Sequence, residues 1–122
     1  MKDYLHDLRD EALANNNFRD VVETGNKMQV VLMSIAFGED IGMEVHPDNE
    51  QVLVCVAGQG KAILNGEESE FNEGDLVLVK AGTQHNFINV GNDPMKIITL
   101  YSPPHHNPGT IHKTKAEAEA SE

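Results

Sequence analysis

Two glycine-bounded runs of alternating residues, 38–58 and 74–89, dominate this chain. The first run carries Glu44 and His46, and the second carries His85. Residues i and i+2 of a strand point to the same face, so Glu44 and His46 share one face if the first run is extended. A ligand pair on one strand, joined by ligands from neighbouring strands, is an arrangement that can hold a divalent metal ion inside a β-barrel.

The rest of the chain is divided by turn residues into short segments that read as strands. Asn65-Gly66 favours a type I′ turn and therefore predicts a hairpin made of residues 61–64 and 67–71. Short strands spaced about 8–12 residues apart are typical of an all-β sandwich or barrel. The other predicted strands are 18–24, 29–37, 43–47, 51–56, 76–79, 84–90 and 95–101.

Both ends of the chain differ from this strand pattern. Residues 3–14 predict a short amphipathic helix, because Tyr4, Leu5, Leu8 and Ala12 recur at helical spacing. After Tyr101, three prolines between residues 102 and 109 argue against regular structure, and residues 114–117 form a capping box that begins a short helix. The predicted organisation is a helical N-terminal segment (1–16), a β-barrel domain (17–101) and a Pro-rich C-terminal tail with a short helix (102–122).

Charge and composition exclude several classes of partner. The formal net charge is −11 and the chain has no cluster of Lys and Arg, so we expect neither nucleic acid nor an anionic membrane as a partner. No apolar stretch approaches the roughly 20 residues of a membrane span, and residues 1–7 do not resemble a signal peptide. Cys55 is the only cysteine, which excludes an intrachain disulfide and a cysteine-based zinc site. We therefore expect a cytoplasmic protein.

On these residues the chain resembles the small cupins, which are single-domain β jelly rolls that commonly hold one metal ion. In the first cupin motif, G-x5-H-x-H-x3/4-E-x6-G, the matching positions are Gly38, Glu44, His46, Gln51 and Gly58. In the second, G-x5-P-x-G-x2-H-x3-N, they are Gly74, Lys80, Gly82, His85 and Asn89. Glu44, Gln51 and Lys80 replace the usual His, Glu and Pro. The resemblance implies an all-β cupin jelly-roll barrel with a short N-terminal helix and a C-terminal tail.

The resemblance also implies one divalent metal ion per chain, bound by Glu44, His46, Gln51 and His85. Two imidazoles and one carboxylate resemble the ligand triad of non-haem iron sites, and iron, manganese, zinc and nickel all stay open. The alternative is a polar quartet that only forms hydrogen bonds within a pocket. Carboxylate and imidazole groups facing an apolar interior are costly unless they are paired or bound to metal, which favours the metal site.

Glu50 competes with Gln51 for one ligand position. Choosing Glu50 breaks the spacing to Gly58, and strand alternation then turns Gln51 outward. If Gln51 instead faces inward, so do Leu53 and Cys55, which form an apolar floor for the pocket. We therefore favour Gln51 as the ligand.

Two further expectations concern Asn89 and the C-terminal tail. Asn89 is expected to brace a turn rather than to contact a substrate. His105, His106 and His112 are expected to be exposed on the tail, but a docked tail could bring His112 over the mouth of the barrel. Ile111 is the expected apolar anchor of such docking.

The opposite face of the strand 51–56 predicts an interaction with a second subunit. If Gln51 faces inward, then Val52, Val54 and Val56 face outward and form an apolar stripe that monomers tend to avoid. Either the strands of residues 18–36 or another copy of the chain must cover this stripe. Because small cupins usually dimerise through such strands, we expect a homodimer.

Several functions fit a metal-binding cupin, since a fold does not determine chemistry. The first hypothesis is a metal-dependent enzyme that acts on a small organic substrate, by dioxygenase-like or other oxidoreductase chemistry. Within this class, metal-dependent isomerisation is a second possible chemistry. The second hypothesis is a cupin that binds a small sugar-type ligand without turnover, and the third is a vestigial structural cupin. No catalytic residue separate from the metal ligands can be identified, so the sequence leaves open whether the protein is an enzyme.

Overall fold

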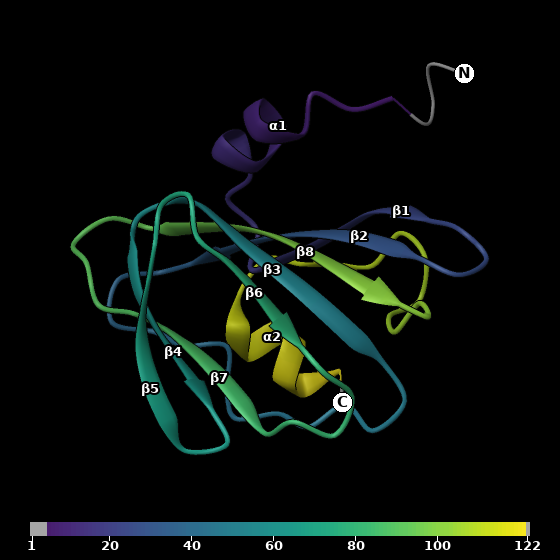
Figure 1. The fold of residues 1–122 in the computed structure, drawn as a ribbon. Helices are drawn as coiled ribbons and strands as arrows, with labels where there is room; N and C mark the ends of the chain where they lie inside the picture. The colour runs from purple at the N-terminus through teal and green to yellow at the C-terminus, as the bar shows by residue number, and fades with distance from the viewer. Residues whose placement is uncertain (1–4, 122) are drawn as a thin grey trace.

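The structure, a computed structural model in which residues 5–121 are described, contains two antiparallel sheets that face each other (Figure 1). The larger sheet has the strand order β6-β3-β8-β2-β1-β9, and the smaller sheet has the order β5-β4-β7. The elements in chain order are α1 (Leu8–Ala14), β1 (Arg19–Thr24), β2 (Gln29–Ile35), β3 (Glu50–Ala57), β4 (Gln59–Leu64), β5 (Glu67–Asn72), β6 (Leu76–Val79), β7 (His85–Asn89), β8 (Met95–Ser102), β9 (Ile111–His112) and α2 (Lys115–Ala120). The predicted all-β jelly roll is confirmed.

The core lies between the two sheets and is built by strand alternation. In β3, Gln51, Leu53 and Cys55 are buried, whereas Val52 and Val54 are only partly covered. From the smaller sheet, the rings of Phe71 and Phe87 pack with centroids 5.0 Å apart. Apolar side chains therefore fill most of the interior, and the inward face of β3 is the one that the sequence predicted.

The predicted turn residues act as expected. Asn65 and Gly66 both have positive φ angles, of 49° and 83°, as a type I′ turn between β4 and β5 requires. The side chain of Asn89 donates to the carbonyls of Ile35 and Asp93 and accepts from the N–H of Gly91. Asn89 thus braces the turn between β7 and β8.

Residues 43–47 are not the regular strand that the sequence predicted. Between β2 and β3 the chain forms only two isolated bridges to β7, Asp40 with Ile88 and Glu44 with His85. The backbone of Gly42 has a φ of 94°, and Pro47 has no N–H to donate, so a continuous ladder cannot form here. The segment still lies against β7, which places Glu44 beside His85.

Helix α1 covers part of the outer face of the larger sheet (Figure 1). Ala12 packs there with Leu32 and Val56, so the helix covers one residue of the predicted valine stripe. The predicted helix begins at residue 3, but the observed helix begins at Leu8. Leu5 is exposed and is not part of the buried face of the helix. Asp3 and Tyr4 of the predicted helix lie outside the described residues. No helix within residues 5–121 has the length and apolarity needed to cross a membrane.

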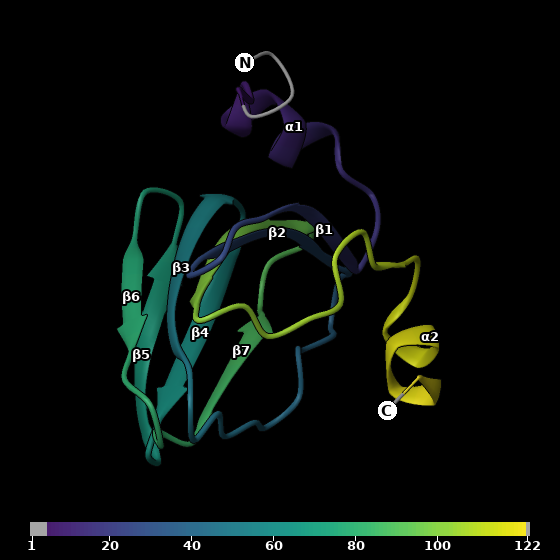
Figure 2. The same cartoon turned by 90° about the vertical axis from the view of Figure 1, so that its right-hand side faces the viewer.

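The C-terminal tail is docked onto the barrel. Strand β9 pairs with β1, and the side chain of Gln29 accepts hydrogen bonds from the N–H groups of His105 and His106. Thr114 caps α2 as the capping box predicted, and Figure 2 shows this helix to one side of the barrel, beside the connection from β2 to β3. The tail is therefore continuous with the larger sheet.

The prediction that Ile111 anchors the tail is wrong. Its side chain is 51% exposed, because β9 adds to the edge of the sheet with this residue facing outward. Ala118 of α2 is buried in the main core instead and supplies the apolar contact.

Candidate metal centre

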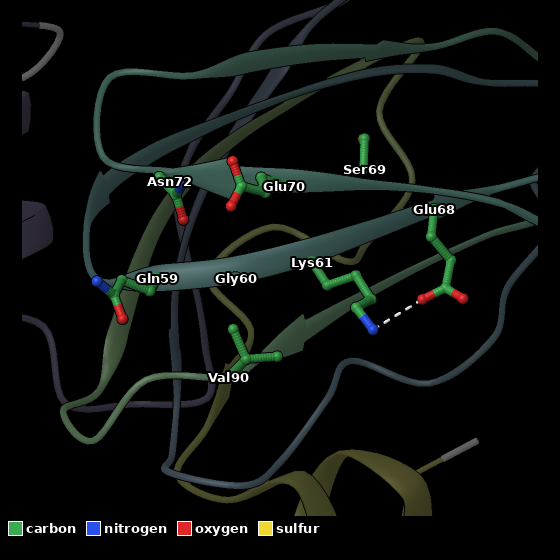
Figure 3. Close-up of a pocket in the computed structure, with 8 residues that line it drawn as sticks. All are labelled: Gln59, Gly60, Lys61, Glu68, Ser69, Glu70, Asn72 and Val90. Atoms are coloured by element: carbon green, nitrogen blue, oxygen red, sulfur yellow. Dashed lines mark ion pairs between the residues drawn. The ribbon is translucent and has the colours of Figure 1, made fainter.

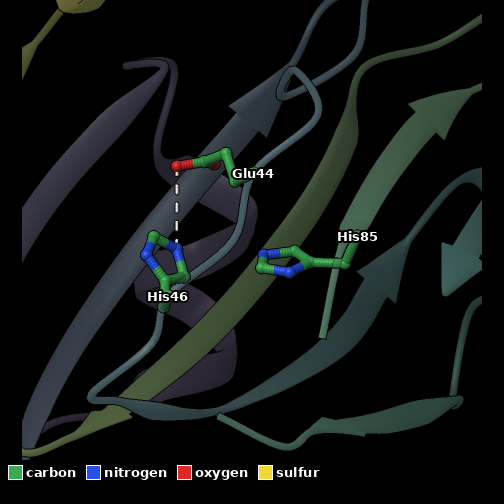
Figure 4. Close-up of side chains that lie close together, drawn as sticks. All are labelled: Glu44, His46 and His85. Atoms are coloured by element: carbon green, nitrogen blue, oxygen red, sulfur yellow. Dashed lines mark ion pairs between the residues drawn. The ribbon is translucent and has the colours of Figure 1, made fainter. Parts of the chain in front are cut away.

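Three of the four predicted ligands lie together at one end of the barrel. Glu44, His46 and His85 each offer a ligand atom, and these atoms lie within 4.8 Å of one another. Figure 4 shows the ring of His85 pointing from β7 toward His46, whose Nε2 lies 3.6 Å from a carboxylate oxygen of Glu44. Both histidines are buried and Glu44 is partly buried.

Backbone hydrogen bonds hold these residues in place. Glu44 and His85 exchange two bonds of 2.9 Å, N–H to carbonyl in each direction. The carbonyl of His46 accepts from the N–H of Gly82 at 2.9 Å, and Gly82 has a φ of 83°. A side chain at residue 82 would strain this turn, which explains why the second motif needs a glycine there.

The tautomer of His85 follows from its contact with Thr83. Its Nδ1 donates to the Thr83 carbonyl at 2.9 Å, which leaves the lone pair on Nε2. That Nε2 is buried and has no hydrogen-bond partner among the described residues. A ring held through one nitrogen while the other is left as an acceptor is the usual arrangement of a metal-binding histidine.

Gln51 is placed inward, as predicted, and Glu50 is exposed at the start of β3. The Gln51 amide donates to Thr99 Oγ1 at 3.0 Å, and its Oε1 is buried without a partner among residues 5–121. Gln51 lies opposite Tyr101 on β8, and the Tyr101 ring packs edge-on against His46. Gln51 and His46 are therefore both neighbours of Tyr101.

Burial keeps the two imidazoles neutral. Desolvation lowers the pKa of His46 to about 4, with smaller contributions from His105, His85 and Arg19. Burial also lowers the pKa of His85, although the Thr83 carbonyl acts in the opposite direction. At pH 7 the contact between His46 and Glu44 therefore joins a carboxylate to a neutral ring, and both rings have a lone pair available for a metal.

The donor set fits a divalent ion. Ligand atoms at roughly 2.1 Å from a common ion lie at most about 4.2 Å apart, so a separation of 3.6 Å fits directly. No separation in the group exceeds 4.8 Å, so the closure needed is at most about 0.6 Å, which side-chain rotation can supply. Two neutral imidazoles and one carboxylate suit iron, manganese, zinc or nickel.

The tail contributes more histidine to the site than the sequence predicted. His105 is exposed as expected, yet its ring packs edge-on against His46 with centroids 4.3 Å apart. His106 is partly buried, and its Nε2 lies 3.4 Å from the hydroxyl of Tyr101. His112 lines a hollow of about 260 Å³ together with Glu44, as expected for a docked tail.

Arg19, the first residue of β1, lies at the site although the sequence pattern did not predict it there. It lines the same hollow as Glu44 and His112, although its side chain is otherwise buried. A signal was present, since Arg19 and Val21 share one face of the predicted strand 18–24 and an apolar valine marks that face as inward.

A second hollow, on the smaller sheet, is not lined by the buried polar side chains that mark the candidate metal centre. It measures about 550 Å³, and the partly buried Lys61 and the exposed Glu68 in its lining form an ion pair of 2.7 Å (Figure 3). None of the buried, unpartnered side-chain atoms found in residues 5–121 belongs to it. The end of the barrel that carries Glu44 is therefore the candidate functional site.

Comparisons with known proteins agree with this geometry. The family model described as "Cupin domain" matches residues 31–101. The chain is 44% identical over 115 residues to YrkC of Bacillus subtilis, covering 88% of this chain and 61% of that protein. It is 40% identical over 113 residues to a protein of Acanthamoeba polyphaga mimivirus, covering 88% and 70%. The crystal structure of BH2720 from Bacillus halodurans superposes with a TM-score of 0.95 at 40% identity, covering 96% of this chain and 93% of that one.

Proposed function

Because this chain belongs to the cupin family, we propose that it binds one divalent metal ion and uses it to act on a small organic molecule. Glu44, His46 and His85 are the proposed protein ligands, with Gln51 as a fourth. The metal, when bound, would supply Lewis-acid chemistry, and with iron also redox chemistry with dioxygen.

The observation that carries this proposal concerns three buried side-chain nitrogen and oxygen atoms. His46 Nε2, His85 Nε2 and Gln51 Oε1 are all buried, and none has a hydrogen-bond partner in the described part of the chain. Each such group costs free energy on the order of 1–3 kcal/mol if nothing binds it. Two of them lie beside the Glu44 carboxylate and the third is on the inward face of β3, which favours a metal site over a quartet that only forms hydrogen bonds.

The ligand that reaches the metal must be small. The two hollows that include Glu44 measure about 260 and 320 Å³, which is room for a compact metabolite but not for a polymer segment. Oxygen-dependent cleavage or oxidation is the chemistry that we favour, because two histidines and a carboxylate are the ligand set of non-haem iron oxygenases. A metal-dependent isomerase, or a ligand-binding cupin without turnover, is the alternative.

Oxygen uptake separates these functions. The protein is loaded with Fe²⁺ or with Zn²⁺, and oxygen consumption is followed while fractions of small molecules from a cell extract are added. Uptake that needs both iron and one fraction supports the oxygenase. Conversion of a compound by the zinc-loaded protein, without oxygen uptake, would identify the isomerase instead.

The state of Cys55 fits the cellular compartment that we expect for this protein. Cys55 is buried, and burial raises the pKa of its thiol to about 11, so it is a packing residue rather than a nucleophile. We expect the protein to work in the reducing cytoplasm with a small molecule as its partner.

A further inference from the structure

We propose that Arg19 binds an anionic oxygen of the small molecule that occupies the site, so that the ligand is a carboxylate or a phosphate. This inference deepens the proposed function, because it names the chemical class of ligand for the same site. The guanidinium of Arg19 would hold the ligand's anionic end while the remainder of the molecule lies toward Glu44 and the two histidines.

The Arg19 side chain has a buried donor that no described residue accepts from. The side chain is only 6% exposed, yet its Nε has no hydrogen-bond partner among residues 5–121. Its Nη1 donates to Nδ1 of His112 at 3.1 Å, and the guanidinium carbon lies 5.3 Å from the ring centre of Phe18. A guanidinium has five N–H donors and no acceptor, so a buried one of this kind calls for an anion.

The Arg19 side chain lies next to the candidate metal centre. Arg19 lines both of the hollows that include Glu44, one shared with His112 and the other with Ile41 and Lys115. It is the one Lys or Arg among the residues that line the first hollow, whereas Lys115 in the second is already paired with Asp40. An anion that enters beside Glu44 therefore meets Arg19 as the available positive group.

The contact with Arg19 also fixes the tautomer of His112. Because a guanidinium can only donate, His112 accepts at Nδ1 and carries its proton on Nε2. The residue thus offers a second donor in the same hollow. A planar Arg fork with a neighbouring N–H matches the oxygens of a carboxylate or phosphate.

The whole-molecule charge makes this local group necessary. With a formal net charge of −11, the protein repels small anions at a distance. A carboxylate or phosphate ligand therefore needs a buried positive partner with little solvent screening at the site itself. Arg19 is in a position to supply it.

The test measures anion binding to the zinc-loaded protein by NMR titration. Acetate, inorganic phosphate and the neutral acetamide are added to wild type, Arg19→Met, Arg19→Lys and the control Arg9→Met. Arg9 is exposed on α1, so its replacement removes the same charge from outside the site. Backbone signals of Thr110 and His112, together with the Arg19 Nε–H signal in wild type, report on the hollow.

We expect acetate or phosphate to bind wild type and Arg9→Met alike, and Arg19→Met at least ten-fold more weakly. Arg19→Lys, which keeps the charge but not the fork, should fall between them and guards against a folding defect in the methionine variant. Acetamide should not compete. The anion that binds more tightly identifies the ligand class as carboxylate or phosphate.

Equal affinity for the anion in folded Arg19→Met and in wild type would overturn the inference. So would a wild-type protein that binds neither acetate nor phosphate at concentrations up to 100 mM, which is on the order of the weakest binding that such a titration detects. Repeating the titration without metal separates this inference from the metal proposal. If the protein fails to take up zinc but still binds an anion in an Arg19-dependent way, the Arg19 site stands and the metal centre is rejected.

Discussion

At the scale of single residues, the assignment of Gln51 and Glu50 is the point on which the site depends most. Their orientations could be predicted because neighbouring residues of a strand face opposite sides, so only one of the two can point into the barrel. The spacing to Gly58 selected Gln51. The predicted answer is the one observed, with Gln51 inward and Glu50 exposed. Arg19 could not be assigned a role in the same way, because a single arginine in a strand does not reveal whether other side chains satisfy it.

Substituting these two neighbours tests the ligand set. Gln51→Ala should weaken metal affinity about ten-fold, because it removes a ligand, whereas Glu50→Ala should leave the affinity within about two-fold. Competition with a fluorescent chelator measures both. A larger loss in Glu50→Ala than in Gln51→Ala would mean that the loop before β3 rearranges to bring the carboxylate inward.

At the scale of elements, the strands were predictable and the segments without regular pairing were not. The Asn65-Gly66 hairpin and the strand 51–56 follow from local patterns. Residues 43–47 and the tail depend instead on which distant surface they meet. The alternating pattern of residues 43–47 does not show that this segment forms only an isolated bridge to β7 in place of a continuous ladder. Likewise, the anchoring of the tail by Ala118 depends on a hollow that exists only in the folded barrel.

A buried charge at Ala118 should release the tail. Ala118→Asp puts a carboxylate into the core, at a cost of several kcal/mol, so undocking of α2 is the favourable response. We expect amide hydrogen exchange at Ile111 and His112 to accelerate at least ten-fold. Ala116→Asp, on the exposed side of α2, is the matched control and should leave exchange unchanged. Unchanged protection in Ala118→Asp would show that β9 holds the tail without help from α2.

The packing of the tail also predicts a dependence of stability on pH. Burial lowers the pKa of His106 to about 3, so the folded state keeps this ring neutral while the unfolded chain takes up a proton near pH 6.5. Stability should therefore fall as the pH drops from 7 toward 5.5, by on the order of 1 kcal/mol from this residue. Urea unfolding of the metal-free protein at pH 7 and at pH 5.5 measures the free energy of unfolding. In His106→Gln, this free energy should decrease less between the two pH values than in wild type.

His6 provides a control of opposite sign. Hydrogen bonds to Glu23 and Glu11 raise the pKa of His6, so its contribution to stability is present below pH 6.5 and is lost at higher pH. His6→Gln should make the fall on acidification steeper rather than shallower. If both variants shift the fall in the same direction, the assignment to His106 is wrong.

At the scale of the whole molecule, the outer face of the larger sheet remains partly uncovered. Helix α1 covers Val56, but Val52 and Val54 pair with Leu78 and Leu76 of β6, which are 50% and 61% exposed. Cross-strand partners point to the same face, so these four residues form one apolar surface at the edge of the sheet. We propose that a second copy of the chain covers it.

Sedimentation tests the homodimer. Wild type should have about twice the chain mass of 13.4 kDa at micromolar concentration, and Leu78→Glu should shift it to the monomer. The control Val90→Glu changes an exposed apolar residue outside the larger sheet and should leave the dimer intact. A wild-type mass near 13.4 kDa at this concentration would exclude the dimer.

The metal content of the purified protein tests the central claim most directly. Elemental analysis of wild type prepared without added metal should find close to one equivalent of a single divalent metal per chain. The double variant His46→Ala/His85→Ala should contain none, because it loses both imidazole ligands. Stoichiometric metal in the double variant, or a wild-type protein that retains no iron, manganese, zinc or nickel even after these ions are supplied, would contradict the account.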